Sequence, residues 1–162
     1  MLAAAVGQAV ASAIGPVVVV AGALGADELV ALLGDTVTVV PNPAWRSGQA
    51  SSLRAGVDWA RASGATAVVV GLGDQPGLDA VAWRAVAAAR DTPVARATYG
   101  GHPGHPVRLD AAIWDLLPTS GDRGAGQLLR ERPDLVTDVP CPGVPGDIDT
   151  NADLSAWPPP PD

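Results

Sequence analysis

Short, uninterrupted apolar runs alternate along this chain with longer segments in which apolar and polar residues are mixed at helical spacing. The runs at residues 17–20 and 67–70 consist almost wholly of valine, and β-branched runs without a polar position favour strands buried on both faces. The same reasoning predicts further strands at residues 36–40, 93–98, 107–109 and 135–139, and helices at residues 3–13, 27–33, 51–62, 79–89, 111–117 and 125–132. This alternation predicts an α/β fold, a three-layer Rossmann-like arrangement with a mostly parallel sheet and helices on both faces.

The chain length of 162 residues suits one ordinary domain, and no interior segment has the composition of a linker. We therefore expect a single domain over residues 1–156. Residues 157–162 contain four consecutive prolines, which exclude a helix or a central strand. They are predicted to form an exposed, polyproline-like end.

The formal net charge is −7, and all ten basic residues are arginines. Proteins that wrap nucleic acid need a basic face, so no nucleic-acid partner is expected. A small anionic ligand would have to be held by a local clamp or through a metal ion.

The single Cys141 cannot form an internal disulfide, and with His102 and His105 it makes too small a set for a structural zinc site. A single cysteine that cannot form an internal disulfide favours a location in the reducing cytoplasm.

Residues 2–26 carry no charge and are long enough to span a bilayer. No basic residue precedes them, Gly15-Pro16 interrupts them, and their two halves have different periods. We therefore expect no membrane segment here.

Two loops with candidate chemistry follow predicted strands, at the sheet edge where α/β proteins usually bind ligands. The first contains Asn42, Gly48, Ser51 and Ser52. Gly48 allows a close backbone approach, and the two serines could cap a helix whose free N–H groups favour an anion or a polar base edge. A plain loop before a capped helix is the alternative.

The second loop reads Gly71-Leu72-Gly73-Asp74-Gln75-Pro76-Gly77. A carboxylate directly after a buried strand, beside a glycine that admits a ligand, is well placed to hold Mg²⁺ on a triphosphate. Aspartate is also a common turn residue, which is the alternative interpretation of Asp74.

Two further segments carry possible ligands. Asp147 and Asp149 alternate, so an extended segment would present both on one side, and they suggest a second Mg²⁺ ligand. The alternative there is a short helix capped by Thr150 or Asn151.

Residues 100–106 are rich in Gly, His and Pro and are expected to form a loop. Its histidines could contact a substrate or a metal, although a simple turn explains the composition equally well.

The order of these segments resembles that of the MobA-like nucleotidyltransferases, and within them the molybdenum cofactor cytidylyltransferase branch. The similarity covers most of the chain from Val17 onward. The matching pieces are Asn42 with Gly48, residues 51–56, 73–76, 104–107 and 121–125, and residues 147–150 with Asp153 and Leu154.

This resemblance implies a fold of the nucleotide-diphospho-sugar transferase type that binds a nucleoside triphosphate and Mg²⁺. It further implies transfer of the nucleoside monophosphate to a phosphorylated small-molecule acceptor, with release of pyrophosphate. By the same carry-over Asp74 and Asp149 would be catalytic metal ligands. The nucleotide would be bound by Asn42, Gly48, Ser51, Ser52 and Gly73.

The acceptor, molybdopterin in this branch, would be faced by Gly104, His105 and Pro106. The run Ser51-Ser52-Leu53 is more similar to the CTP-using members than to the GTP-using members, so CTP is the expected nucleotide. A transferase with another phosphorylated acceptor is an alternative, as is a catalytically inactive module that binds a nucleotide or cofactor.

The sequence departs from the family at one place. Members open with a strand and a Gly-rich loop of the type Leu-Ala-Ala-Gly-x-Ser-x-Arg-x-Gly-x-x-Lys, which nothing here matches, and this chain contains no lysine. Either a truncated start or a lost loop would explain the difference, and we favour truncation. Because the missing strand would lie inside the sheet, we expect a sheet that lacks a central neighbour or has the gap filled by another segment. We also expect weak or no transferase activity.

Overall fold

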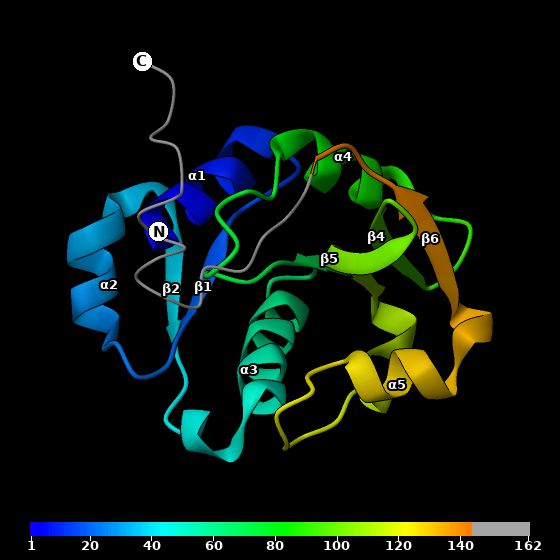
Figure 1. The fold of residues 1–162 in the computed structure, drawn as a ribbon. Helices are drawn as coiled ribbons and strands as arrows, with labels where there is room; N and C mark the ends of the chain where they lie inside the picture. The colour runs from blue at the N-terminus through cyan, green and yellow to red at the C-terminus, as the bar shows by residue number, and fades with distance from the viewer. Residues whose placement is uncertain (144–162) are drawn as a thin grey trace.

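The computed structural model describes residues 1–143 (Figure 1). Its helices are α1 (Leu2–Ser12), α2 (Ala26–Leu33), α3 (Gln49–Ala62), α4 (Ala80–Ala88) and α5 (Gly126–Glu131). Its strands are β1 (Val18–Ala21), β2 (Thr38–Pro41), β3 (Ala67–Val70), β4 (Val94–Tyr99), β5 (His102–Asp110) and β6 (Val136–Pro140). Short 3₁₀ helices are η1 (Gly34–Thr36), η2 (Trp45–Ser47), η3 (Ala111–Leu116) and η4 (Pro133–Leu135).

Helices cover both faces of the strands (Figure 1). On one face α1 packs beside α4, and the amide of Ala80 donates a hydrogen bond to the side-chain oxygen of Gln8. On the other face α3, η3 and α5 contribute Val57, Ile113 and Leu129 to one core. In the four-stranded sheet only β5 runs against its neighbours, since it is antiparallel to β3 and β4 while β4 and β6 are parallel. The predicted α/β fold is confirmed.

The strands fall into two sheets, of order β1-β2 and β3-β5-β4-β6. Within residues 1–143 no strand pairing joins β1 to β3, although α3 packs against both. The valines of β1 and all of β3 are only half-buried, whereas such runs are normally buried on both faces of a sheet. The expected discontinuity is therefore confirmed. Among residues 1–143, the backbone donors and acceptors on one edge of β1 and of β3 therefore have no strand partner.

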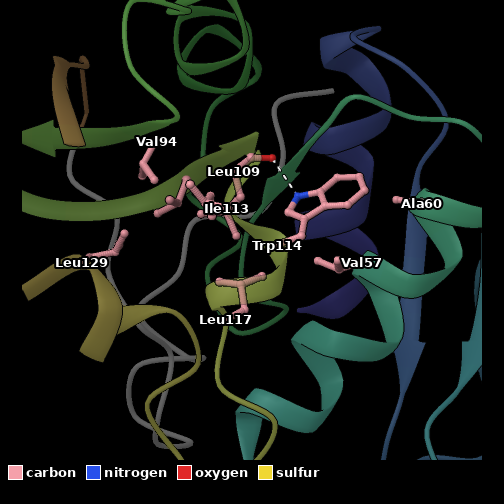
Figure 2. Packing of buried hydrophobic residues seen from close by; sticks show 9 residues of the cluster. Val57, Ala60, Val94, Leu109, Ile113, Trp114, Leu117 and Leu129 are labelled. Carbon is pink, nitrogen blue, oxygen red and sulfur yellow. Dashed lines mark hydrogen bonds between the residues drawn. The ribbon is translucent and has the colours of Figure 1, made fainter. Parts of the chain in front are cut away.

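The main core lies between the four-stranded sheet and the helices α3, η3 and α5 (Figure 2). Trp114 is its largest fully buried side chain, 1% exposed, and its indole N–H donates to the Leu109 carbonyl at 3.1 Å. That bond satisfies a polar group that would be costly to bury alone. The buried residues of this cluster are Val57, Ala60, Val94, Val107, Leu109, Ile113, Trp114, Leu117 and Leu129. The opposite face of the sheet is covered by smaller clusters around Leu78, Trp83 and Val86.

The prediction of a loop over residues 100–106 is wrong. β5 begins at His102, and only Gly100 and Gly101 separate it from β4. Both glycines have positive φ, 57° and 85°, as a two-residue turn matched to strand twist requires. Pro106 lies beyond the end of β3 and where the pairing with β4 shifts register, so its missing N–H interrupts no regular ladder.

The uncharged stretch over residues 2–26 is divided between a helix and a strand. α1 ends at Ser12, Ala13 adopts a left-handed conformation with φ of 53°, and β1 follows. In the part of the chain that the structure describes, no helix is both long enough and apolar enough to cross a bilayer.

Candidate functional site

Asn42, which follows β2, holds the loop after that strand in place. It is 6% exposed, and its Nδ2 donates to Ser51 Oγ at 2.9 Å and to Ser52 Oγ at 3.1 Å. Its Oδ1 accepts from the amide of Ala44 at 3.0 Å. The structure thus brings together three of the residues predicted to bind a nucleotide. Because both amide hydrogens of Asn42 are already donated within the loop, its geometry suits positioning of the loop better than donation to a ligand.

The serines do not cap α3, contrary to one interpretation of the sequence. α3 begins earlier, at Gln49, and its N-cap is Gly48, with φ of 104°. The Ser51 hydroxyl instead lies 2.8 Å from the Gly48 carbonyl and 3.0 Å from the Ala44 carbonyl. It therefore fixes the loop by donating to a backbone acceptor, while its oxygen accepts from Asn42.

Gly48 lies against a second loop, formed by residues 118–125. The amide of Gly121 donates to the Ser47 carbonyl, and the amide of Ala50 donates to the Gly121 carbonyl, both at 2.9 Å. A Cβ at Gly48 would lie 2.5 Å from the carbonyl group of Gly121. The sequence predicted close backbone approach at Gly48 but did not identify the approaching segment. A cavity of about 280 Å³ opens beside this contact, lined by Pro118, Ser120, Gly121, Asp122, Arg123 and neighbouring residues.

Asp74 lies in the loop that follows β3, as the sequence predicted. Its side chain is half-buried, and its Oδ1 is fully buried without a hydrogen-bond partner within the described residues. Gln75 and Pro76 beside it are buried, and the side chain of Leu2 reaches over Gly73. Asp79 at the end of the loop accepts from the amide of Val81 and caps α4. Asp79 is thus explained by its role as a helix cap, whereas capping does not explain the position of the Asp74 carboxylate.

Asp149 lies outside the described residues, so its convergence with Asp74 stays a prediction. Within residues 1–143 no group of three or more His, Cys, Asp or Glu side chains is close enough to hold a metal ion. The described part of the chain supplies Asp74 as the single predicted metal ligand.

Gly104, His105 and Pro106 lie on β5 rather than in a loop. Pro106 is fully buried and follows a cis peptide bond, while Gly104 and His105 are half-buried. The hydroxyl of Tyr99 on β4 donates to the His105 carbonyl at 2.7 Å, which ties the two strands together where their register shifts. The predicted acceptor residues are thus placed on a sheet. Whether they contact an acceptor remains a prediction.

Tyr99, the only tyrosine of the chain, permits a direct test of this part of the sheet. Burial, with the nearby Cys141 and Asp79, raises the pKa of Tyr99 to about 12. Since this folded pKa lies above the value of about 10 in an unfolded chain, the neutral hydroxyl stabilises the fold below about pH 10 and this contribution is lost as pH rises through the folded pKa. Ultraviolet difference titration of tyrosinate should give a midpoint near 12 for the native chain.

The urea-unfolded chain should titrate with a midpoint near 10, and Tyr99→Phe should abolish the signal. Equal midpoints for the native and unfolded chains would show that the hydroxyl is not held as the structure shows.

The two covered faces of the sheet, together with the Asp74 loop at the end of β3, define a Rossmann-like α/β domain of the kind that binds nucleotides at its strand ends. The family described as the MobA-like NTP transferase domain matches residues 1–136, and the chain belongs to it. Nicotine blue oxidoreductase of Paenarthrobacter nicotinovorans is 34% identical over 113 residues, which are 64% of this chain and 54% of that protein. The chain therefore spans about half the length of this curated relative.

Solved structures agree with this assignment. Rv0371c of Mycobacterium tuberculosis, in a structure described as a complex with manganese, is 27% identical with a TM-score of 0.76, covering 96% of this chain and 84% of that chain. A nucleotidyl transferase from Methanothermobacter has a TM-score of 0.78 at 21% identity, covering 96% of this chain and 77% of that chain, and shares the fold.

Proposed function

We propose that this chain takes part in a nucleotidyltransferase reaction, in which a nucleoside monophosphate passes from a nucleoside triphosphate to a phosphorylated small-molecule acceptor and pyrophosphate is released. Membership of the MobA-like NTP transferase family supports the reaction class. CTP as the nucleotide and molybdopterin as the acceptor follow from the resemblance of the Ser51-Ser52-Leu53 run to the CTP-using members.

The observation that carries this proposal is the buried Oδ1 of Asp74, which has no hydrogen-bond partner in the part of the chain that the structure describes. A carboxylate oxygen removed from water without a hydrogen-bond donor is costly unless a cation compensates it. Mg²⁺ prefers oxygen ligands and is commonly held by one or two carboxylates, with phosphate oxygens and water completing its shell. Asp74 fits that role, and the manganese complex of Rv0371c supports a divalent cation for this family. Asp149 is proposed as the second carboxylate.

Phosphoryl transfer needs accurate positioning and stabilisation of charge more than covalent help from the protein. A bound divalent cation would supply the charge neutralisation. The chain itself would hold that cation through Asp74 and keep the rim loop in shape through Asn42, Ser51 and Ser52, whose mutual hydrogen bonds leave the loop little freedom. Gly104, His105 and Pro106 are proposed to face the acceptor.

The test compares CTP binding with Mg²⁺, with Mn²⁺ and without a divalent cation, by calorimetry on the 162-residue chain. We expect cation-dependent binding that Asp74→Asn weakens about tenfold or more, the loss of one charge-assisted contact or metal ligand. Asp74→Asn should leave the melting temperature unchanged or raise it, because the neutral amide is cheaper to bury. Asp91→Asn, at an exposed carboxylate, is the matched control and should bind as the wild type does. Cation-dependent binding of equal strength in Asp74→Asn would refute the assignment of Asp74.

A catalytically inactive binding module is the second candidate, and the break in the sheet favours it. β3 precedes the Asp74 loop directly but has a strand partner on one edge only within residues 1–143, so the loop is supported from one side. We expect weak or no pyrophosphate release by this chain with CTP and Mg²⁺. Measured turnover would decide for the enzyme, whereas CTP binding without turnover would support the module.

A further inference from the structure

The break between β1 and β3 is bounded by two strand edges and covered on both sides. The edge of β1 away from β2 and the edge of β3 away from β5 have no strand partner in residues 1–143. On one side of the break α3 packs against both strands. On the other side Val17, directly before β1, and Val69 of β3 pack against the cluster that contains Trp83. Because one helix and one cluster bridge the break, the two free edges face each other across it.

In β1 the hydrogen bonds to β2 show which backbone groups face the break. The carbonyls of Val17 and Ala21 accept from the first amide of β2 and from the amide directly after β2, at 2.9 and 3.0 Å. Successive residues of a strand direct their N–H and C=O groups to opposite edges. Val19 therefore faces β2 as well, whereas Val18 and Val20 direct their backbone groups into the break.

The same alternation identifies the free groups of β3. The carbonyl of Thr66, directly before this strand, accepts from the amide directly after β5 at 2.9 Å. Alternate residues from Thr66 onward thus face β5, so Ala67 and Val69 direct their backbone groups into the break. Together with Val18 and Val20 they present donors and acceptors on both edges. One extended segment between the strands would satisfy both sets.

A buried indole beside the break also lacks an acceptor. Trp83 is 9% exposed, and its Nε1 has no hydrogen-bond partner among the described residues. Its ring lies at the end of β3, since a Cβ at Gly71, directly after that strand, would come within 2.6 Å of the ring carbon Cζ2. An indole N–H buried without an acceptor is unfavourable. A carbonyl of a segment bound in the break would supply the acceptor.

We propose that the break binds one extended, apolar peptide segment of about five residues, which adds as a strand between β1 and β3 and does not come from residues 1–162. β1 and β3 have four residues each, which sets the length. Because both sides of the break are covered, the segment must be apolar on both faces. Residues 144–162 contain no run of four apolar residues free of proline, so they do not match this chemistry. The proposal is independent of the transferase function, since it needs only the two strand edges.

Amide hydrogen exchange with and without a capped peptide of alternating valine and alanine between Gly-Ser ends tests the proposal. The amides of Val18, Val20, Ala67 and Val69 should exchange fast in the free chain, and saturation with the peptide should slow them about tenfold or more, because bonded amides exchange only after opening. The amide of Val19, which faces β2, is the internal control and should change less. Protection located elsewhere would overturn the proposal.

A peptide with the same side chains but with N-methyl groups on alternate residues is the matched control for the probe. It keeps the apolar surface and loses the donors of one edge, so it should not protect the four amides. Equal protection by this peptide would overturn pairing between strands as the mode of binding.

Trp83→Phe removes the indole donor and should weaken peptide binding by about threefold to tenfold, as expected for one hydrogen bond. Trp114→Phe is the control, because the Trp114 N–H already donates to the Leu109 carbonyl, and it should bind the peptide as the wild type does. Equal binding by Trp83→Phe would overturn the place of Trp83 in the site. Analytical ultracentrifugation distinguishes a second copy as the occupant: a dimer of the free chain with the same amides protected would overturn the proposal of a separate peptide.

Discussion

Trp114→Ala is expected to lower the free energy of unfolding by about 3–5 kcal/mol, the range for removing a fully buried aromatic side chain. Trp114 is 1% exposed in the centre of the main core, and its loss would also leave the Leu109 carbonyl without the indole donor (Figure 2). Such a change is a large part of the 5–15 kcal/mol that is typical for a whole domain. Urea denaturation followed by far-ultraviolet circular dichroism would measure it.

Two variants show whether burial or merely the loss of a tryptophan is responsible. Trp114→Phe keeps most of the ring volume but loses the N–H donor, so a cost of about 1–2 kcal/mol is expected. Trp45→Ala removes the same side chain from a half-buried position on the short 3₁₀ helix η2 and should cost about 2 kcal/mol or less. Equal losses for Trp114→Ala and Trp45→Ala would contradict the central place of Trp114 in the core.

Strands could be predicted from the sequence where a run of β-branched residues lies in a sheet. The valine-rich run at 67–70 coincides with β3, and the run at 17–20 is shifted by one residue in β1. β-branched residues are stiff, pack well on a pleated surface and have no polar atom to satisfy, so a short run of them has few other stable conformations. The helix over residues 79–89 was equally clear, because Asp79 provides the N-cap that fixes its start.

Other elements depend on information that a local pattern does not contain. The composition of residues 100–106 is typical of loops, yet β3 and β4 impose strand geometry on Val107 and its neighbours and extend it back to His102. The helix predicted over residues 111–117 is the 3₁₀ helix η3, which holds Ile113 and Trp114 in the core. In both cases tertiary packing overrides local preference.

In the candidate site, too, contacts within one segment could be predicted from the sequence, whereas contacts between distant segments could not. Asn42, Ser51 and Ser52 could be grouped from the sequence because one short loop contains them, and the structure joins them by hydrogen bonds. The contact between Gly48 and Gly121 could not be predicted, because no periodicity links segments so far apart in the chain. The repeated glycines of residues 121–126 were the available signal, since glycine is the residue that permits close approach of two backbones.

The second large effect is expected at that contact. Gly48→Ala should destabilise the chain by about 3 kcal/mol, because a Cβ would add overpacking to an unfavourable positive φ. The atoms it would meet at 2.5 Å belong to the Gly121 backbone, which two hydrogen bonds hold in place, so they cannot move aside cheaply. Urea denaturation would give the loss.

Gly64→Ala is the matched control for this substitution. Gly64 also has a positive φ, 76°, but nothing lies within 4 Å of a Cβ built there. Its replacement should therefore cost only the backbone strain, about 1 kcal/mol. The difference between the two variants isolates the steric cost of separating the loops around Gly48 and Gly121. If both glycines tolerate alanine equally, the two loops are not packed as the structure shows.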